Sequence, residues 1–371
     1  MKNYAIMHLE KHIADIRSDG SCTIYEPDFM PCNLYWETED ADFETRLNNL
    51  NNFYYWGASR LLTLDRKYAK EILNSLGMKQ VVTDKDRAEI SFSYHALCLT
   101  DVYWVRELEE SVTFAEINLY DHSLSDAFVD VSLRGQSLTA QNAELIKKAD
   151  SAGDLSTLGL APKAWIRRDG KFWLLKDGEA KDVAAELLAS KICRCFDVDQ
   201  VLYEPWDYQN QRVSRSVMMT SKDMSIVPME YVEIYAVNHG KDLHNMVFAM
   251  DPVGYHRMNI VDYLVGNTDR HWSNWGFSVD NKNNQFRKLH PLMDFNHSFR
   301  SYDSLEGARC LTTQETLSQK EAAIRGVKAV GLGLIKALPN DLAPFFDEAN
   351  RLFGMRLDLM FEQRLNLLKQ I

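Results

Sequence analysis

The segment 257–298 constrains the fold of this chain more than any other part of the sequence. Its helix-like beginning ends at Gly266-Asn267, two residues that commonly terminate helices. Two strand-like runs, 275–279 and 286–289, then flank a polar turn. A helix, a loop and a β-hairpin in direct succession indicate a mixed α+β fold.

A second hairpin is predicted upstream, where Asp169-Gly170 separates two short apolar runs. An Asp-Gly pair in this position is a strong β-hairpin signal. An amphipathic helix is expected at 180–195, and the pattern becomes mainly helical after about residue 225. The other strand candidates in this region are 164–167, 171–175, 200–203 and 212–219.

The length of 371 residues exceeds the usual size of one cooperative core, so two or three structural units are expected. With 46% hydrophobic and 26% charged residues the composition is that of an ordinary globular protein. A helix-like stretch that breaks into Ser, Ala, Gly and Asp at 151–154 indicates a boundary. We predict an N-terminal region at 1–140, a small strand-rich lobe at 141–225 and a mainly helical lobe at 226–371.

The acidity of the chain argues against nucleic acid as a direct partner. The formal net charge is −11, whereas nucleic-acid binding depends on clustered Lys and Arg. The six cysteines include no Cys-x-x-Cys pair, and a single residue separates Cys193 from Cys195. Free thiols are therefore expected rather than a disulfide framework or a structural zinc site.

The sequence predicts a cytoplasmic protein that does not enter a membrane. Charged residues at Glu10, Lys11 and Asp15 interrupt the apolar stretch that a signal peptide requires. No apolar run approaches the ~20 residues needed to span a bilayer.

The loop after the predicted helix carries the candidate chemistry. Asp269 and Asn274 stand five positions apart, and Asp294 follows the predicted hairpin directly. Phosphoryl transfer needs one carboxylate aimed at the attacking hydroxyl and a set of oxygen ligands for Mg²⁺. Taken alone, each of these residues is also common in surface turns. Their order along the chain and the hairpin between them favour a functional site.

A lysine at the end of the upstream hairpin is the second candidate. Lys176 closes the apolar run 171–175, and a buried lysine there needs a counter-charge. Glu186 on the next predicted helix is a suitable partner, and Asp182 and Glu179 compete for the same role.

The motifs Gly266-Asn267-Thr268-Asp269-Arg270-His271-x-x-Asn274-x-Gly276 and Asp294-Phe295-Asn296-x-Ser298 together resemble the HipA-like kinases. A more distant resemblance is to the phosphatidylinositol 3/4-kinase-like catalytic domains. The resemblance covers about residues 150–300. It implies a two-lobed protein-kinase-like fold that uses ATP and Mg²⁺, with an additional N-terminal region.

The resemblance also implies roles for individual residues. Asp269 would be the catalytic base or the residue that orients the hydroxyl, and Asn274 and Asp294 would bind the metal. His271 would order the loop, although a packed histidine that holds the turn is an equal alternative. Lys176 would contact the ATP phosphates, with Glu186 beside it.

The segment 156–163 is similar to the short phosphate-binding loop of the same family. Ser156, Gly159 and Lys163 are its characteristic residues, and backbone amides in such a turn bind phosphate oxygens. The chain lacks both the GxxxxGK[ST] and the GxGxxG loop, so a plain junction into a strand is an equal alternative. In the family the serine is a site of autophosphorylation, which suggests the same switch at Ser156. Met218 and Met219 are placed near the adenine, or in the core.

These observations predict a kinase that transfers the γ-phosphate of ATP to a hydroxyl, foremost of a protein Ser or Thr. A small-molecule hydroxyl acceptor and an antitoxin-like regulatory protein are further expected partners. A second hypothesis is a nucleotide-binding pseudokinase or toxin–antitoxin interaction module without turnover. A third, a metal-dependent hydrolase or nuclease, would need further ligands that the sequence does not offer at suitable spacing.

Overall fold

The computed structural model describes residues 2–39, 41–75, 83–122, 127–135, 161–336 and 342–371. The chain forms two compact units. Unit 1 consists of Met1–Leu174, Thr220–Ile226 and Val279–Gln285, and unit 2 of Leu175–Met219, Val227–Ser278 and Phe286–Ile371. The three-part division at residues 140 and 225 stays a prediction.

A four-stranded antiparallel sheet in the order β3-β2-β1-β4 forms the first layer of unit 1. Ile6 in the central strand lies opposite Ala14 on one side and Val105 on the other, and all three are buried. The strands are β1 (Tyr4–His8), β2 (Lys11–Ile16), β3 (Cys22–Ile24) and β4 (Tyr103–Glu107).

Short helices complete the cores of unit 1. The stacked rings of Phe53 and Phe92, 4.6 Å between centroids, join α1 to α3. Gly57 permits this packing, because a Cβ there would lie 2.5 Å from the Phe92 ring. The helices are η1 (Pro27–Phe29), α1 (Phe43–Ser59), α2 (Ala69–Ser75), α3 (Asp84–Ser93), α4 (Phe114–Ile117) and α5 (Ala127–Arg134).

Two β-hairpins supply the strands that lead to the site. Asp169 and Gly170 turn the first hairpin with φ of 53° and 73°, and Gln209 and Asn210 turn the second with 49° and 62°. Positive φ at both central residues is the type I′ geometry that suits twisted strands. The hairpins are β5 (Lys163–Arg168) with β6 (Lys171–Lys176) and β7 (Tyr203–Tyr208) with β8 (Gln211–Val217), in the sheet order β5-β6-β8-β7. The predicted hairpin at Asp169-Gly170 is therefore confirmed.

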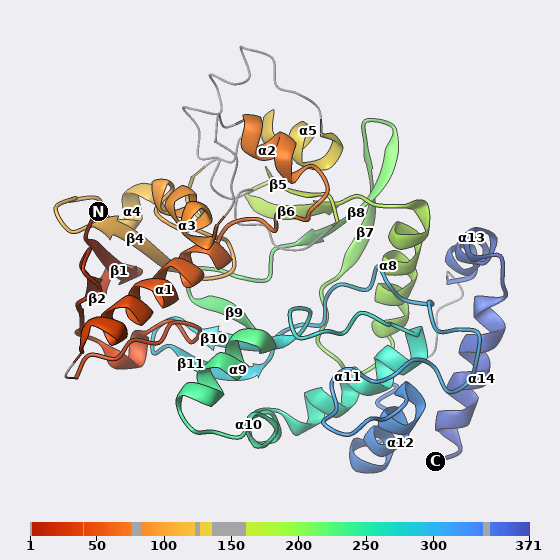
Figure 1. The fold of residues 1–371 in the computed structure, drawn as a ribbon. Helices are drawn as coiled ribbons and strands as arrows, with labels where there is room; N and C mark the ends of the chain where they lie inside the picture. The colour runs from red at the N-terminus through yellow and green to blue at the C-terminus, as the bar shows by residue number, and fades with distance from the viewer. Residues whose placement is uncertain (1, 40, 76–82, 123–126, 136–160, 337–341) are drawn as a thin grey trace. The chain divides into compact units, whose positions relative to one another are not determined.

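Unit 2 is mainly helical around one hydrophobic core, in which Leu187, Ile260 and Phe361 are almost fully buried. Figure 1 shows α8 beside β7 and β8, and α13 beside α14. The helices are α8 (Ala180–Cys193), α9 (Met229–Asn238), α10 (Leu243–Met250), α11 (Pro252–Val265), α12 (Gln319–Val330), α13 (Ala343–Phe353) and α14 (Leu357–Lys369).

The candidate loop leads directly into β10 of a three-stranded sheet, which has the order β11-β10-β9. Its strands are β9 (Met224–Pro228), β10 (Gly276–Asp280) and β11 (Gln285–Leu289). Gly276 is required at the start of β10, because a Cβ there would lie 2.0 Å from the Val227 carbonyl oxygen. The predicted hairpin at 275–289 is confirmed, with bounds shifted by one residue.

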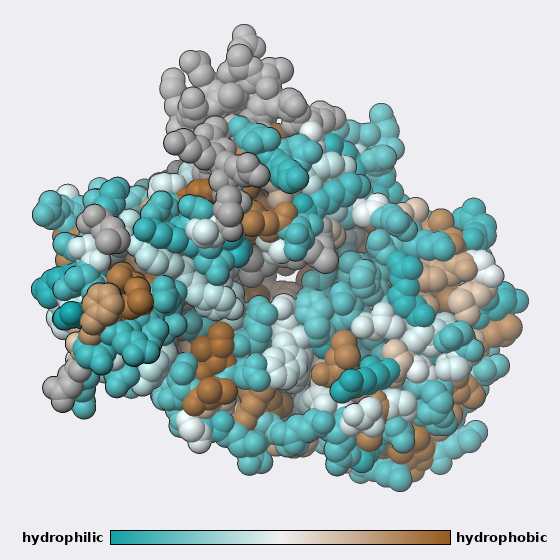
Figure 2. Space-filling view, viewed as in Figure 1, coloured by the Kyte–Doolittle hydropathy of each residue, from teal (hydrophilic) through white to brown (hydrophobic). Residues whose placement is uncertain are grey.

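The surface carries apolar side chains in scattered patches on a largely hydrophilic face (Figure 2). Such scatter is ordinary for folded proteins. A membrane-crossing helix is not found among the described residues, whose helices are too short or too polar for it. The structure describes all six cysteines, and none of them is joined to another by a disulfide.

Candidate active site

Lys176, the last residue of β6, lies in a buried cluster of opposite charges in unit 2. Its Nζ is 2.5 Å from Oε1 of Glu186 and also donates a hydrogen bond to Oδ1 of Asp294. Burial alone would lower the pKa of Lys176, but the carboxylates of Asp294 and Glu186 outweigh it and raise this pKa well above its usual value. The lysine is therefore charged, and its charge is held where the two carboxylates meet.

Glu186 is the partner that the structure selects from the three carboxylates considered for Lys176. It lies in the middle of α8 and is 1% exposed. Its second oxygen, Oε2, accepts a hydrogen bond from the hydroxyl of Ser214 on β8. Asp182, by contrast, pairs with Arg300, 2.5 Å away. Both oxygens of Glu186 are thus occupied, which fixes the carboxylate toward Lys176.

Asp294 reaches the same cluster from the segment after β11. Its backbone N–H donates to the phenolic oxygen of Tyr203 at 3.2 Å. Its φ is 59°, in the left-handed region that residues other than glycine seldom adopt. The Asp294 side chain is 22% exposed, against 6% for Lys176. The Asp294 side chain is therefore partly accessible to solvent, whereas Lys176 is buried.

The candidate loop begins where α11 ends at Gly266, with φ of 58°. The side-chain nitrogen of Asn274 donates to the backbone carbonyl of Asp269 at 2.8 Å and approaches its carboxylate at 3.5 Å. The backbone N–H of Asn274 donates to the carbonyl of His271 at 2.9 Å. These bonds close the five-residue spacing into one compact turn.

Two histidines flank the carboxylate of Asp269. Nε2 of His271 is 3.7 Å from Oδ1, and Nδ1 of His297 is 3.4 Å from Oδ2. His271 therefore contacts the carboxylate and is also part of the turn, since its Nδ1 accepts a bond from the Ser273 N–H at 3.2 Å. The contribution of His297 was not predicted from the sequence.

The loop and the Asp294 segment contact each other on both sides of Asp294. Before it, the carbonyl of Met293 accepts a bond from Arg270 at 2.6 Å. After it, the carbonyl of His297 accepts a bond from the backbone N–H of Thr268 at 3.3 Å. The structure thus brings the segments of all three predicted residues, Asp269, Asn274 and Asp294, together in unit 2.

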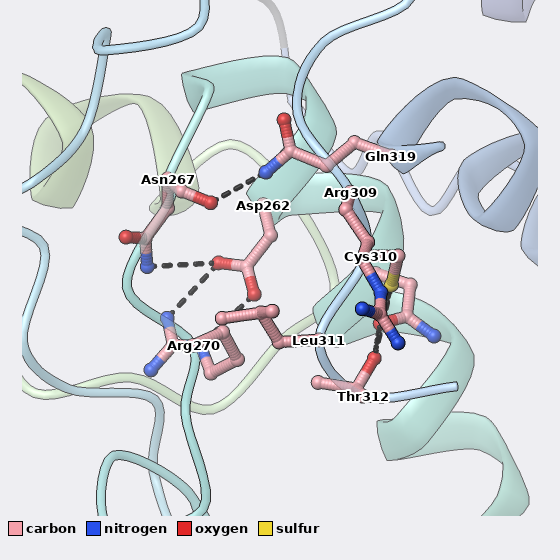
Figure 3. Close-up of a pocket in the computed structure, with 9 residues that line it drawn as sticks. Asp262, Asn267, Arg270, Arg309, Cys310, Leu311, Thr312 and Gln319 are labelled. Atoms are coloured by element: carbon pink, nitrogen blue, oxygen red, sulfur yellow. Dashed lines mark hydrogen bonds and ion pairs between the residues drawn. The ribbon is translucent and has the colours of Figure 1, made fainter. Parts of the chain in front are cut away.

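A buried ion pair between Arg270 and Asp262 supports the loop from α11. Nε and one terminal nitrogen of Arg270 donate to the two carboxylate oxygens of Asp262 at 2.9 and 3.0 Å. Burial lowers the pKa of Arg270, but Asp262 more than compensates and the net shift is upward. Figure 3 shows Asp262 between Asn267 and Arg270, in a small pocket that Gln319 also lines.

No role was predicted from the sequence for either member of this pair, although Arg270 is part of the motif, and none for Tyr203 or Ser214. A signal for the pair was present, because Asp262 lies in an otherwise apolar part of the predicted helix. A carboxylate there must find a cation on folding, and the next loop offers Arg270. Tyr203 and Ser214 left no comparable signal.

The remaining predicted residues lie at the start of β5, after β8 or outside the described residues. Met218 and Met219 follow β8 and are half-buried, and Met219 packs against the core of unit 2. Lys163 lies in unit 1, where it begins β5 and its carbonyl accepts a bond from Arg66. Ser156 and Gly159 lie outside the described residues. Their roles stay predictions.

The oxygen atoms at the loop suit a hard divalent cation. Among the described residues, no three His, Cys, Asp or Glu side chains are grouped to hold a metal ion. Mg²⁺ commonly takes one or two protein oxygens and shares the rest of its sphere with phosphates and water. Because the Asn274 nitrogen faces the Asp269 carbonyl, its amide oxygen faces away and is the atom that would bind a cation.

Comparison with solved structures identifies the fold. The chain resembles HipA from a complex of HipA, HipB and operator DNA of the Shewanella oneidensis MR-1 toxin–antitoxin system, at 11% identity and a TM-score of 0.52. The match covers 98% of this chain and 91% of the other. The proinflammatory kinase CtkA of Helicobacter pylori matches 56% of this chain and 92% of its own at 12% identity, with a TM-score of 0.40.

No protein-family model and no curated protein sequence matches the chain. The near-complete structural match to HipA confirms the predicted fold class, an α+β HipA-like kinase fold. At this identity the match establishes the fold alone.

Proposed function

We propose that the protein is an ATP- and Mg²⁺-dependent kinase that transfers the γ-phosphate to a hydroxyl, foremost of a protein Ser or Thr. The observation that carries this proposal is the meeting of Lys176, Glu186 and Asp294 in one buried cluster. The loop with Asp269 and Asn274 is bonded to the same segment as Asp294. The site thus combines a positive charge that can bind phosphates with oxygen atoms that can bind a cation. Phosphoryl transfer requires both.

Each residue has a role in this proposal. Lys176, oriented by Glu186, binds phosphate oxygens of ATP, and the oxygens of Asn274 and Asp294 bind Mg²⁺. Bound Mg²⁺ would neutralise charge on the phosphates. The oxygen of the acceptor hydroxyl bonds to the γ-phosphorus, and ADP leaves. Asp269 accepts the proton that this hydroxyl loses. His271 holds the turn around Asp269.

Segments beyond this cluster have proposed roles as well. We assign the strand-rich lobe to residues 141–225 and the helical lobe to 226–371, with 1–140 as an additional region. Ser156, Gly159 and Lys163 would contact phosphates, and Met218 and Met219 the adenine. Autophosphorylation at Ser156 would repel the ATP phosphates, and mass analysis after incubation with Mg-ATP would detect it.

An antitoxin-like protein is the proposed regulatory partner. The HipA structure that this chain resembles was solved with HipB and operator DNA. That assembly gives no support to the expectation that the present chain avoids nucleic acid. Co-purification of the chain with the product of a neighbouring reading frame, with and without nuclease treatment, would test both points.

The decisive experiment is incubation of the purified protein with radiolabelled ATP, Mg²⁺ and a cell extract. Asp269→Asn should lower label transfer at least about a hundredfold, because it removes the proton acceptor. Asp294→Asn should lower it similarly through loss of a metal ligand. Asp347→Asn, an exposed carboxylate on α13, is the matched control and should leave transfer unchanged.

The results separate the hypotheses. Binding of ATP by the wild type without any label transfer would favour the pseudokinase or interaction module. Transfer that survives both substitutions would remove Asp269 and Asp294 from their assigned roles.

A further inference from the structure

The peptide group between Met293 and Asp294 is held at both of its polar ends. Its carbonyl, on Met293, accepts a hydrogen bond from Arg270 at 2.6 Å. Its N–H, on Asp294, donates to the phenolic oxygen of Tyr203 at 3.2 Å. Because these two bonds lie on opposite edges of one planar unit, they fix the orientation of that plane.

The orientation of this peptide matters because of the backbone of Asp294. Its φ of 59° is the torsion about the N–Cα bond, which joins this peptide plane to the α-carbon that carries the side chain. An aspartate in the left-handed region is strained and persists only where the surroundings enforce that conformation. Arg270 and Tyr203 provide that enforcement, and so decide where the Asp294 carboxylate points.

Arg270 is itself held in place and reaches the loop as well. Asp262 on α11 binds its guanidinium through two parallel bonds, and both side chains are at most 7% exposed. The terminal nitrogen that binds Met293 also donates to the backbone carbonyl of Asn274 at 2.8 Å. One guanidinium therefore joins the Asn274 turn to the peptide that orients Asp294.

We infer that Arg270, held by Asp262, and Tyr203 are positioning residues that set the distance and direction between the amide of Asn274 and the carboxylate of Asp294. This inference rests on the proposed function, in which those two groups share one Mg²⁺. Neither residue touches the cation. They act through the Met293–Asp294 peptide and the Asn274 carbonyl.

The test is a Mg²⁺ titration of the binding of a fluorescent, non-hydrolysable ATP analogue to the full chain. Arg270→Lys keeps the charge but cannot reproduce the forked bonds to Asp262, Met293 and Asn274. Tyr203→Phe removes only the hydroxyl that accepts the Asp294 N–H. Each change should raise the Mg²⁺ concentration at half-maximal binding about 10-fold to 100-fold, as loss of an outer-sphere partner does at metal sites.

Unit 1 offers a matched control. Arg60 binds Asp101 through two bonds of 2.7 and 2.8 Å and also donates to the Tyr103 carbonyl at 3.0 Å. Arg60→Lys removes the same kind of buried fork and should lower folding stability comparably while leaving the Mg²⁺ midpoint unchanged. A merely structural role for Arg270 would make the two variants behave alike.

The outcomes separate this inference from the function on which it rests. An unchanged midpoint in folded Tyr203→Phe, with Mg²⁺-dependent binding in the wild type, overturns the inference and leaves the proposed function standing. A wild type that binds the analogue without any dependence on Mg²⁺ overturns both. If Arg270→Lys does not fold, the Tyr203→Phe result decides.

Discussion

Lys176 and Glu186 place opposite charges inside unit 2, with Nζ and Oε1 2.5 Å apart and the side chains 6% and 2% exposed. The lysine comes from β6 and the glutamate from α8, so the pair joins a strand to a helix. Ser214 on β8 binds the other oxygen of the glutamate. The Glu186 carboxylate thus connects three elements, α8, β6 and β8.

Glu186→Ala should lower the free energy of unfolding by about 3 kcal/mol, because breaking a buried pair leaves a desolvated charge with less compensation. Denaturation with urea measures this change. Glu348→Ala provides the control, since Glu348 pairs with the partly exposed Arg212 and its loss should cost less than about 1 kcal/mol. If both variants lost the same free energy of unfolding, burial would not be what makes the Lys176–Glu186 pair important for stability.

Lys176→Met should reduce phosphate transfer about a hundredfold to a thousandfold, the usual cost of removing one preorganised electrostatic group. The methionine matches the length of the stem but brings no charge to the phosphates. Initial rates at saturating ATP and Mg²⁺ provide the measurement. Lys336→Met, at a solvent-exposed position, should keep the wild-type rate. A Lys176→Met enzyme of full activity would exclude this lysine from the site.

Stability should rise with pH between about pH 4 and 6.5 through two buried histidines. Burial lowers the pKa of His8 in unit 1 and of His290 in unit 2 to about 4. The unfolded chain takes up these protons near pH 6.5, so in this window it binds more protons than the folded chain. Each histidine therefore adds up to about 1.4 kcal/mol per pH unit to the free energy of unfolding.

His290→Leu should remove the contribution of one of these histidines. Nδ1 of His290 lies 2.9 Å from the Pro291 carbonyl, and its buried Nε2 has no hydrogen-bond partner among the described residues. In urea unfolding across this pH range, the stability of the variant should fall less steeply toward acid than that of the wild type. Parallel curves would show that His290 is not buried in its neutral form.

Gly266→Ala should destabilise the protein more than Gly240→Ala. Both glycines end helices with nearly equal φ, 58° and 59°. At Gly240 no described atom lies within 4 Å of an added Cβ, so only the backbone cost of about 1 kcal/mol applies. At Gly266 the Cβ would lie 2.7 Å from the Tyr302 ring, which adds about 1–3 kcal/mol of overpacking.

Thermal unfolding of the two glycine variants checks this difference. Gly266 lies between α11 and the candidate loop, so its variant should also lose affinity for Mg-ATP, while Gly240→Ala should not. Equal melting temperatures would mean that Tyr302 moves aside without cost.

Local signals in the sequence were sufficient for the elements around the site. The Asp169-Gly170 turn and the Gly266 helix end were predicted because each depends on a residue that tolerates positive φ. The strand expected at 200–203 was wrong. The backbone N–H of Val201 donates to the Leu292 carbonyl, and that of Tyr203 donates to the hydroxyl of Ser190. The strand β7 begins only at Tyr203.

In the segment 63–77 apolar residues recur every four positions, a pattern that predicts one helix over the whole segment, but α2 begins only at Ala69. Tyr68 immediately before it has a φ of 69°, which no helix accommodates, and its ring lies against Gly135. Such a contact joins positions far apart in the chain and leaves no local pattern. The same reason hid Tyr203, whose hydroxyl meets the backbone of Asp294.

The alternation of the chain between its two units has a consequence for protein synthesis. Unit 1 needs Thr220–Ile226 and Val279–Gln285 in addition to its first 174 residues. The Ile226 N–H bonds to the Thr100 carbonyl, and the Tyr103 hydroxyl bonds to Asn284 across 181 positions. A nascent chain that has left the ribosome only as far as residue 174 therefore cannot complete unit 1, which must wait until Gln285 has emerged.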